Sequence, residues 1–390
     1  MKLQTLPDRI LQGIRNSVGE GPIKLHEPIF EGNESRYLQD CIDSTYVSSV
    51  GKYVDRFEIE LAKFTGAKYA VSVVNGTAAL HLALKIAGII PGDEVLVQGF
   101  TFVATANAIS YCGATAHFVD IEAENLGIDP IKLSEYLVEI STTSNGLTIN
   151  TKTGKTIKAL IVMHTFGHPS KIHELSEVAK RFNLVLLEDA AESIGSYYKG
   201  GHTGTFGAMG TLSFNGNKTI TTGGGGAIIT NNSELAKRAK HLSTTAKIPD
   251  RWAFKHDEIG YNYRMPNINA AIGCAQLEDL PSKLESKREL YRRYELAFSE
   301  VNEVQLIKEP NECQSNYWLQ TLRLRSPDLK IRDEILDILN SAGFMSRPGW
   351  DVITSLKPFE TNPSMILETA NNIFNSVINI PSILKKSMQK

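Results

Sequence analysis

Short apolar runs alternate with helical segments through much of this chain, and this alternation is the feature that most constrains its fold. The runs are as short and as continuously apolar as strands covered on both faces, and they lie at residues 69–74, 94–98, 116–119, 157–163 and 184–187. Helix-like segments separate them at residues 78–87, 103–111 and 171–182. The pattern predicts an α/β fold with a mostly parallel central sheet and helices on both faces.

The pattern changes near residue 265. A long helical stretch follows at residues 267–301, broken by Pro281, and then a strand at 318–324 and a helix at 331–342. At 390 residues the chain can bury two cores. We therefore predict a large cofactor-binding α/β domain with an N-terminal extension at 1–265, and a bridging helix with a smaller α+β domain at 266–390.

Charge and cysteine content exclude several classes of protein. The 41 basic and 43 acidic residues give a net charge of −2, and no basic run indicates a nucleic-acid surface. The four cysteines are scattered without metal-ligand spacing, as expected for buried free thiols in a reducing cytosol. The sequence has neither a signal peptide nor an apolar run of about 20 residues that could span a membrane. We expect a cytoplasmic protein that binds small molecules or proteins.

A single lysine, Lys218, lies among small polar residues and glycines in the segment 213–226, SFNGNKTITTGGGG. Glycines permit positive φ and let other groups approach the backbone closely. One reading is a flexible turn with a solvated lysine before a strand at 227–230. The other is a reactive amine with space around it, and the segment alone does not decide between them.

Polar or aromatic residues follow three of the predicted strands. Asn75-Gly76-Thr77 leads from a strand into a helix, and the free amides at a helix N-terminus suit a phosphate. Phe102 and Asp189 follow two other strands, on the side where open parallel sheets bind ligands. A core aromatic and a solvated loop carboxylate are the ordinary alternatives for these two residues.

Two histidines, His164 and His168, have a spacing that could hold a metal on a helix. Gly167 and Pro169 argue against a helix there, so we predict no metal site. The insertion at 141–156 carries Asn-Gly and Thr-Gly pairs that suggest surface hairpin turns.

Taken together, Lys218, Asp189, Phe102 and the backbone of Gly76 and Thr77 match the requirements of pyridoxal 5'-phosphate. A lysine amine forms a Schiff base with the aldehyde, and a carboxylate pairs with the protonated ring nitrogen. The helix N-terminus supplies donors to the phosphate, and an aromatic ring can stack on the cofactor.

These motifs resemble the DegT/DnrJ/StrS sugar aminotransferases, fold type I pyridoxal-phosphate enzymes, from about residue 23 to 387. The matching segments are NGTAAL at 75–80, FTFVAT at 100–105, EDAA at 188–191, NGNK at 215–218 and GYNYR at 260–264. The resemblance implies that the Gly76-Thr77 backbone binds the phosphate, that Phe102 stacks on the ring and that Asp189 holds the ring nitrogen.

The resemblance assigns further residues to the cofactor site. It implies that Lys218 forms the Schiff base, that Ser213 contacts the phosphate and that Glu192 lies beside the cofactor. It also implies a homodimer with shared active sites, in which Asn262 reaches the phosphate of the neighbouring subunit. One departure is that many members have Gly-Glu-Gly-Gly after the lysine, whereas this chain has glycine throughout 223–226.

The substrates follow from the same resemblance. HTFGHP at 164–169, RPGW at 347–350 and NIPS at 379–382, with NGNK, look most like the branch that aminates UDP-linked 4-keto-6-deoxy-N-acetylhexosamines. Glutamate would give its amino group to the cofactor, and pyridoxamine 5'-phosphate would pass it to the sugar, in amino-sugar and polysaccharide biosynthesis. GDP- and dTDP-linked sugars are the alternatives.

The residues that would contact the sugar nucleotide are less legible. The candidates are Tyr46, Ser48, Ser49, Arg347 and Trp350, although the loop at 45–51 could simply link two helices and Arg347 could be an ordinary surface arginine.

Two other functional classes share this fold. Pyridoxamine-dependent sugar dehydratases lack the Schiff-base lysine, and a non-catalytic sugar-nucleotide-binding protein would be expected to have lost Lys218 or Asp189. This chain has both residues, which favours the aminotransferase.

Overall fold

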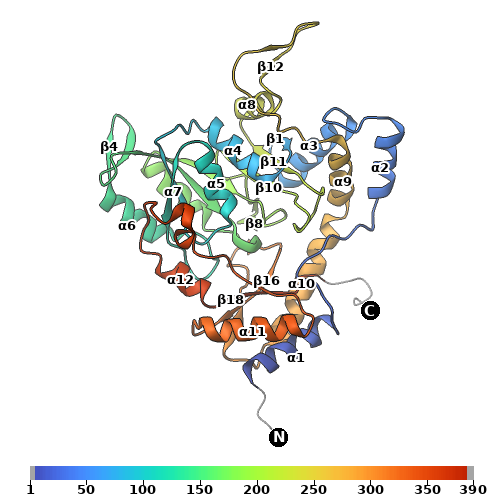
Figure 1. The fold of residues 1–390 in the computed structure, drawn as a ribbon, viewed down its shortest axis with the longest axis vertical. Helices are drawn as coiled ribbons and strands as arrows, with labels where there is room; N and C mark the ends of the chain where they lie inside the picture. The colour runs from blue at the N-terminus through green and yellow to red at the C-terminus, as the bar shows by residue number, and fades with distance from the viewer. Residues whose placement is uncertain (1–4, 384–390) are drawn as a thin grey trace.

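The computed structural model describes residues 5–383. Residues 1–4 of the predicted large domain and residues 384–390 of the predicted smaller domain lie outside the described residues. The last residues of the family resemblance, 384–387, also lie outside them. A nine-stranded sheet forms the centre of the molecule, with β4 and β5 off its main path (Figure 1). In spatial order the main path is β1 (Tyr69–Val73), β11 (Gly226–Thr230), β10 (Met209–Ser213), β7 (Val185–Asp189), β6 (Thr156–Met163), β2 (Glu94–Gln98) and β3 (Thr115–Val119).

The main path is parallel except at β11, which pairs antiparallel with both β1 and β10. The predicted mostly parallel sheet is thus confirmed. The insertion at 141–156 forms the predicted hairpin, β4 (Ser141–Ser144) with β5 (Leu147–Asn150), and β5 also pairs with the start of β6.

Helices cover both faces of this sheet. On one face α4 (Gly76–Ile86), α5 (Val103–Tyr111) and α8 (Ser233–Ser243) share a large apolar core with the strands. The other face is covered by α2 (Glu34–Asp43), α3 (Lys52–Thr65), α6 (Pro130–Ile140), α7 (Ile172–Arg181) and α9 (Asn267–Glu278). This two-sided cover explains why the strands are apolar along their length rather than alternating.

A four-stranded antiparallel sheet forms a smaller lobe at the bottom of Figure 1. Its order is β14 (Val304–Leu306), β16 (Gln320–Leu324), β18 (Val377–Ile380) and β17 (Arg347–Pro348). The helices of this region are α10 (Leu280–Ala297), α11 (Leu329–Ser341), α12 (Glu368–Phe374) and the short turns η2 (Ile353–Ser355) and η3 (Lys357–Phe359).

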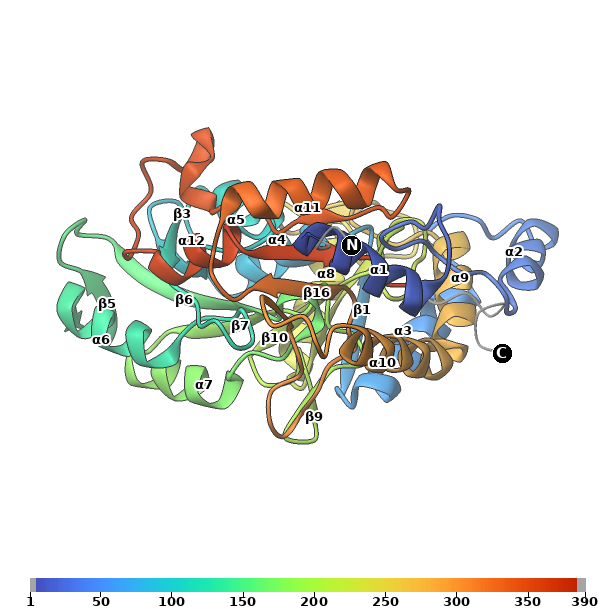
Figure 2. The same cartoon turned by 90° about the horizontal axis from the view of Figure 1, so that it is seen from below.

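The first helix, α1 (Leu6–Val18), lies with this smaller lobe. Its buried Ile10 and Ile14 share a core with Leu290 of α10 and Leu339 of α11. Figure 2 shows α1 beside α11 at the near side of the molecule. The division at residue 265 remains a prediction, but it placed this helix with the large domain, whereas the helix packs on C-terminal elements.

The long helical stretch predicted at 267–301 is two helices. α9 ends at Glu278, and α10 begins at Leu280 with Pro281 in its first turn. Proline is tolerated there because the first amides of a helix have no intrahelical acceptor. The break that the sequence predicted is therefore confirmed.

Three short ladders complete the structure. β15 (Cys313–Gln314), β8 (Tyr197–Tyr198) and β9 (Gly201–His202) form one small sheet, and β12 (Lys247–Ile248) and β13 (Lys255–His256) form a hairpin that projects at the top of Figure 1. The four cysteines are free and buried, as predicted. Within residues 5–383, no helix is both long enough and apolar enough to cross a membrane.

Candidate active site

A cavity of about 360 Å³ lies where several parallel strands of the main sheet end. Met163, Asp189 and Ser213 are the last residues of β6, β7 and β10. The turn after β1, at residues 75–77, and Phe102, after β2, also line the cavity. The full lining is Asn75, Gly76, Thr77, Leu80, Phe102, Ala104, Met163, Asp189, Ala191, Glu192, Ser213, Asn215, Asn217, Lys218, Trp318 and Trp350.

The N-terminus of α4 forms one side of the cavity. Asn75 is the N-cap, and its side chain accepts a hydrogen bond from the amide of Ala78 at 2.8 Å. The amides of Gly76 and Thr77 have no intrahelical acceptor and carry the positive end of the helix dipole. A Cβ at Gly76 would lie 2.8 Å from the Cβ of Ser213, so glycine lets this helix meet β10. The arrangement can bind a phosphate.

Asp189 is a buried carboxylate at the end of β7, only 3% exposed. One of its oxygens accepts from Thr105 Oγ1 at 2.7 Å, and the other accepts from the amide of Ala191 at 3.1 Å. Burial raises the pKa of Asp189, although both hydrogen bonds and the charge of Lys218 oppose the rise. Within residues 5–383 no cation lies within 4.0 Å of this carboxylate, so it can accept a cationic ligand group.

Lys218 extends into the same cavity, and its side chain is 12% exposed. Its Nζ lies 3.1 Å from Glu192 Oε1, and the other oxygen of Glu192 accepts from the amide of Phe166 at 2.9 Å. Burial raises the pKa of Glu192 to about 7, while the nearby Lys218 charge limits the rise. An amine and a carboxylate that titrates near neutrality therefore share this site.

Aromatic rings form the remaining wall. Phe102 is the N-cap of α5 and is 49% exposed, whereas Phe166 is buried. Trp350 packs on Phe166 with ring centroids 4.7 Å apart and on Phe102 at 6.3 Å. The face of Trp318 lies 4.0 Å from Lys218 Nζ. A flat ligand could therefore stack against an aromatic surface here.

Pyridoxal phosphate fits this set of residues. A protonated ring nitrogen would supply the cationic partner that Asp189 does not find among residues 5–383, and Lys218 offers an amine to the aldehyde. The α4 N-terminus and Ser213 can take the phosphate. We find these groups around a single cavity, which a lysine in a flexible turn would not require.

The structure brings together most of the residues that the sequence predicted. Gly76, Thr77, Phe102, Asp189, Glu192, Ser213, Lys218 and Trp350 all line the cavity. His164 instead pairs with buried Glu188, its Nε2 3.0 Å from Glu188 Oε2, and His168 is buried. The two histidines flank a single short 3₁₀ turn, η1 (Thr165–Gly167), rather than lying on an α-helix.

Other candidates do not line this cavity. Asn262 is exposed, and its side-chain oxygen accepts from Arg264 Nε at 3.0 Å. The carbonyls of Tyr46 and Ser48 accept hydrogen bonds from Asn267, which ties the loop that holds Ser49 to the start of α9. Arg347 is exposed on β17, opposite Asn379 of β18.

Among the lining residues that sequence reasoning missed, Trp318 is the one whose side chain contacts Lys218. The sequence pattern predicts a strand at 318–324, but β16 begins at Gln320, and Tyr317, just before Trp318, has a positive φ of 46°. This kinked segment carries the indole back to the large domain. Trp318 is a hundred positions from Lys218, and no local pattern signals the contact.

Comparison with known proteins identifies the family. The DegT/DnrJ/EryC1/StrS aminotransferase family model matches residues 28–389. The chain is 38% identical to GDP-perosamine synthase of Vibrio cholerae, with 92% of this chain and 94% of that protein covered. It is 32% identical to a UDP-4-amino-4,6-dideoxy-N-acetyl-beta-L-altrosamine transaminase of Campylobacter jejuni, with 85% of each covered.

A solved structure shares the fold. The aminotransferase TlmJ of Streptoalloteichus hindustanus superimposes with a TM-score of 0.84 at 25% identity, and the match covers 94% of this chain and 96% of that one. With the family match and the cavity chemistry in agreement, the chain belongs to the DegT/DnrJ/EryC1/StrS aminotransferase family.

Proposed function

We propose that this sugar aminotransferase moves an amino group from glutamate to the 4-keto carbon of a nucleotide-linked 4-keto-6-deoxy sugar. The observation that carries the proposal is one cavity that holds both the Lys218 amine and the buried Asp189 carboxylate, which has no cation within 4.0 Å among residues 5–383. The dehydratase and non-catalytic alternatives are disfavoured, because each would dispense with at least one of these groups.

Pyridoxal phosphate is the cofactor of this enzyme. When bound, it supplies an electron sink that stabilises negative charge on the carbon that gains or loses the amino group. Asp189 would hold the ring nitrogen, Phe102 would lie against the ring, and Ser213 with the amides of Gly76 and Thr77 would hold the phosphate.

Lys218 Nζ is the proton carrier in this proposal. It is the basic side chain of the cavity lining, so it can accept the proton from the Cα of glutamate and later deliver a proton to C4 of the sugar. Glu192 Oε1, 3.1 Å away, holds the amine in place between these transfers. Because glutamate and the sugar would use the same amine in turn, two separate half-reactions with ping-pong kinetics are expected.

The nucleotide is best assigned as GDP. The sequence resemblance favoured a UDP-linked N-acetylhexosamine, but the relative named for a GDP sugar is 38% identical and the relative named for a UDP sugar is 32% identical. The UDP-linked sugar is the second candidate, and a dTDP-linked sugar the third. Of the proposed sugar contacts, Trp350 is supported by its place in the cavity.

A homodimer with shared sites is part of the proposal. Asn262 is exposed and does not line the cavity of its own chain, so it is available to a second copy. Large exposed apolar side chains lie nearby in the chain, at Trp252 and Phe254 in the hairpin between β12 and β13 and at Ile259 after it, as expected of a surface that a partner covers. The cytoplasmic location inferred from the sequence stays a prediction.

The decisive experiment identifies the product. Purified enzyme with pyridoxal phosphate and glutamate is incubated with GDP-, UDP- and dTDP-linked 4-keto-6-deoxy sugars, and the products are analysed by mass spectrometry. We expect replacement of the ketone by an amine in the GDP sugar, dependent on glutamate and lost in Lys218→Ala. Amination of no 4-keto sugar by the wild type, or full activity in Lys218→Ala, would contradict the proposal.

A further inference from the structure

We propose that Trp318 is a positioning residue for Lys218, holding its amine by the face of the indole ring and its loop by the indole N–H. The inference rests on the proposed role of Lys218. It assigns a function to a residue of the smaller lobe, which the sequence motifs did not include.

The first observation is the contact between the amine and the ring. Lys218 Nζ lies 4.0 Å from the centroid of the Trp318 ring and also pairs with Glu192 Oε1 at 3.1 Å. Tryptophan is the strongest aromatic partner for a cation, and the attraction grows when water is excluded. The Lys218 side chain is 12% exposed. The ring therefore favours a positive charge on this nitrogen and limits the directions in which it can point.

The second observation is that the same tryptophan fastens the loop. Trp318 Nε1 donates to the carbonyl of Asn217 at 2.7 Å, immediately before Lys218. Asn316 donates to Thr219 Oγ1 at 3.3 Å, immediately after it, and its side-chain oxygen accepts from the amide of Trp318 at 2.8 Å. Asn316 also donates to the carbonyl of Glu192 at 2.8 Å. One short segment thus holds both neighbours of Lys218 and the backbone of its carboxylate partner.

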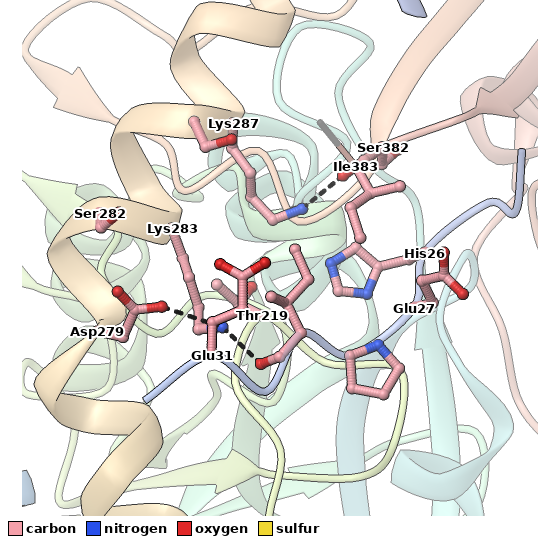
Figure 3. A pocket seen from close by; sticks show the side chains of 13 residues that line it. His26, Glu27, Glu31, Thr219, Asp279, Ser282, Lys283, Lys287, Ser382 and Ile383 are labelled. Atoms are coloured by element: carbon pink, nitrogen blue, oxygen red, sulfur yellow. Dashed lines mark hydrogen bonds and ion pairs between the residues drawn. The ribbon is translucent and has the colours of Figure 1, made fainter. Parts of the chain in front are cut away.

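The third observation is the support behind this segment. Figure 3 shows a second, smaller cavity of about 50 Å³, lined by His26, Thr219 and Lys287 among others. Buried Lys287 donates from Nζ to the carbonyls of Trp318 and Ser382, each at 2.9 Å. Burial lowers the pKa of Lys287 to about 7. A neutral amine keeps two N–H donors, so the carbonyl of Trp318 can be held in either protonation state.

Thr219 lines this smaller cavity, whereas Asn217 and Lys218 line the larger cavity of the candidate active site. The loop 217–219 therefore separates the two cavities. Because it has a cavity on each side, its position depends on the hydrogen bonds that neighbouring segments make to it. A purely structural alternative exists, because Trp318 also packs on Phe166 with centroids 6.5 Å apart. A purely structural role would not alter the proton equilibrium at Lys218, whereas the proposed positioning role would.

The test is a pH titration of the visible absorbance of the enzyme loaded with pyridoxal phosphate. Trp318→Leu removes the ring face and the N–H, and the midpoint should move to lower pH by about one unit, a tenfold change in the proton equilibrium. Trp318→Phe keeps a ring and should move it by about half a unit. The matched control is Phe374→Leu, which removes an aromatic ring that contacts a different cation, Arg332, and is not part of the cavity lining, so it should leave the midpoint in place.

Kinetics give a second readout. Trp318→Phe should lower kcat about tenfold with little change in the KM for glutamate, because the proton carrier rather than the donor site is disturbed. An unshifted midpoint in Trp318→Leu, or an equal shift in Phe374→Leu, would overturn the proposal. If Trp318→Leu does not fold, the Trp318→Phe variant tests the proposal instead. A midpoint and a kcat both equal to those of the wild type would then contradict the positioning role.

Borohydride reduction followed by peptide mass spectrometry separates this inference from the proposed function. If the cofactor is not fixed to Lys218 in the wild type, the proposed function itself fails. If it is fixed there and the Trp318 variants titrate like the wild type, only the positioning role fails.

Discussion

At the residue scale, the Glu192 carboxylate makes the stability of the protein depend on pH. It is 3% exposed and yet pairs with Lys218, and burial raises its pKa from 4.5 to about 7. A buried carboxyl group with a raised pKa releases its proton later in the folded than in the unfolded chain. Ionisation of Glu192 therefore lowers stability as the pH rises from about 4.5, and the loss is complete above about 7.

Glu192→Gln should remove this pH dependence, because glutamine does not ionise. The stability of the variant relative to the wild type, both without cofactor, should grow by about 3 kcal/mol between pH 4.5 and pH values above 7. Urea unfolding at a series of pH values measures the difference. Glu234→Gln, at an exposed glutamate, is the matched control and should show no such growth. Parallel pH curves for Glu192→Gln and wild type would contradict the assignment.

At the element scale, the four-glycine run between the lysine loop and β11 has different requirements at different positions. A Cβ at Gly226 would lie 2.5 Å from the backbone carbonyl of Asn75, at the turn that begins α4. A Cβ at Gly224 would have nothing nearer than the carbonyl of Val74 at 3.9 Å. Many members of the family have glutamate at position 224, where this chain has glycine. Of the two positions, 224 is the one with space for a side chain.

These two glycines form a matched pair for mutation. Gly226→Ala should destabilise the protein by about 1–3 kcal/mol, because backbone on both sides must move. Gly224→Ala should change stability by less than about 0.5 kcal/mol. Urea unfolding of the two variants checks both values. Equal losses of stability would show that the run acts as a unit rather than through the contact of β11 with the α4 turn.

At the scale of the whole molecule, the proposed dimer can be tested by complementation. Lys218→Ala and Asn262→Ala should each be poorly active as pure proteins. If Asn262 serves the neighbouring site, a mixed dimer places both substitutions in one site and leaves the other intact. Random mixing after subunit exchange should then restore about a quarter of wild-type activity.

The alternative gives a different result. If Asn262 acted on its own chain, each site of a mixed dimer would carry one substitution, and mixing would restore nothing. Analytical ultracentrifugation of the same samples verifies that dimers form, and wild-type protein carried through the exchange procedure controls for losses during mixing.

Several residues of the candidate site could be predicted from the sequence because they directly follow strands of the parallel sheet. In a parallel sheet, residues that directly follow successive strands meet at one edge, so Asp189 and the Gly76-Thr77 turn could be placed together from strand positions alone. Ser213 was assigned only through the family resemblance, because β10, which ends there, is not among the predicted strands. Lys218 follows β10 by a few residues and belongs to the same edge. Local patterns were sufficient wherever a strand end fixed the location.

The same reasoning failed where the contact joins distant segments. α1 looked like an extension of the large domain, since an amphipathic helix shows that it has a buried face but not what covers it. Trp318 looked like a strand residue, since nothing near it in sequence specifies the kink at Tyr317.

By itself, then, the sequence determined the α/β architecture and the cofactor chemistry, and it singled out Lys218 as the candidate lysine, because strand periodicity and residue types at strand ends are local properties. The tertiary structure alone decided what contacts that lysine: Glu192, Trp318, and through the carbonyl of Trp318 the buried Lys287. These contacts bring together residues from both lobes of the molecule. Their positions depend on how the lobes pack, which no local pattern in the chain encodes.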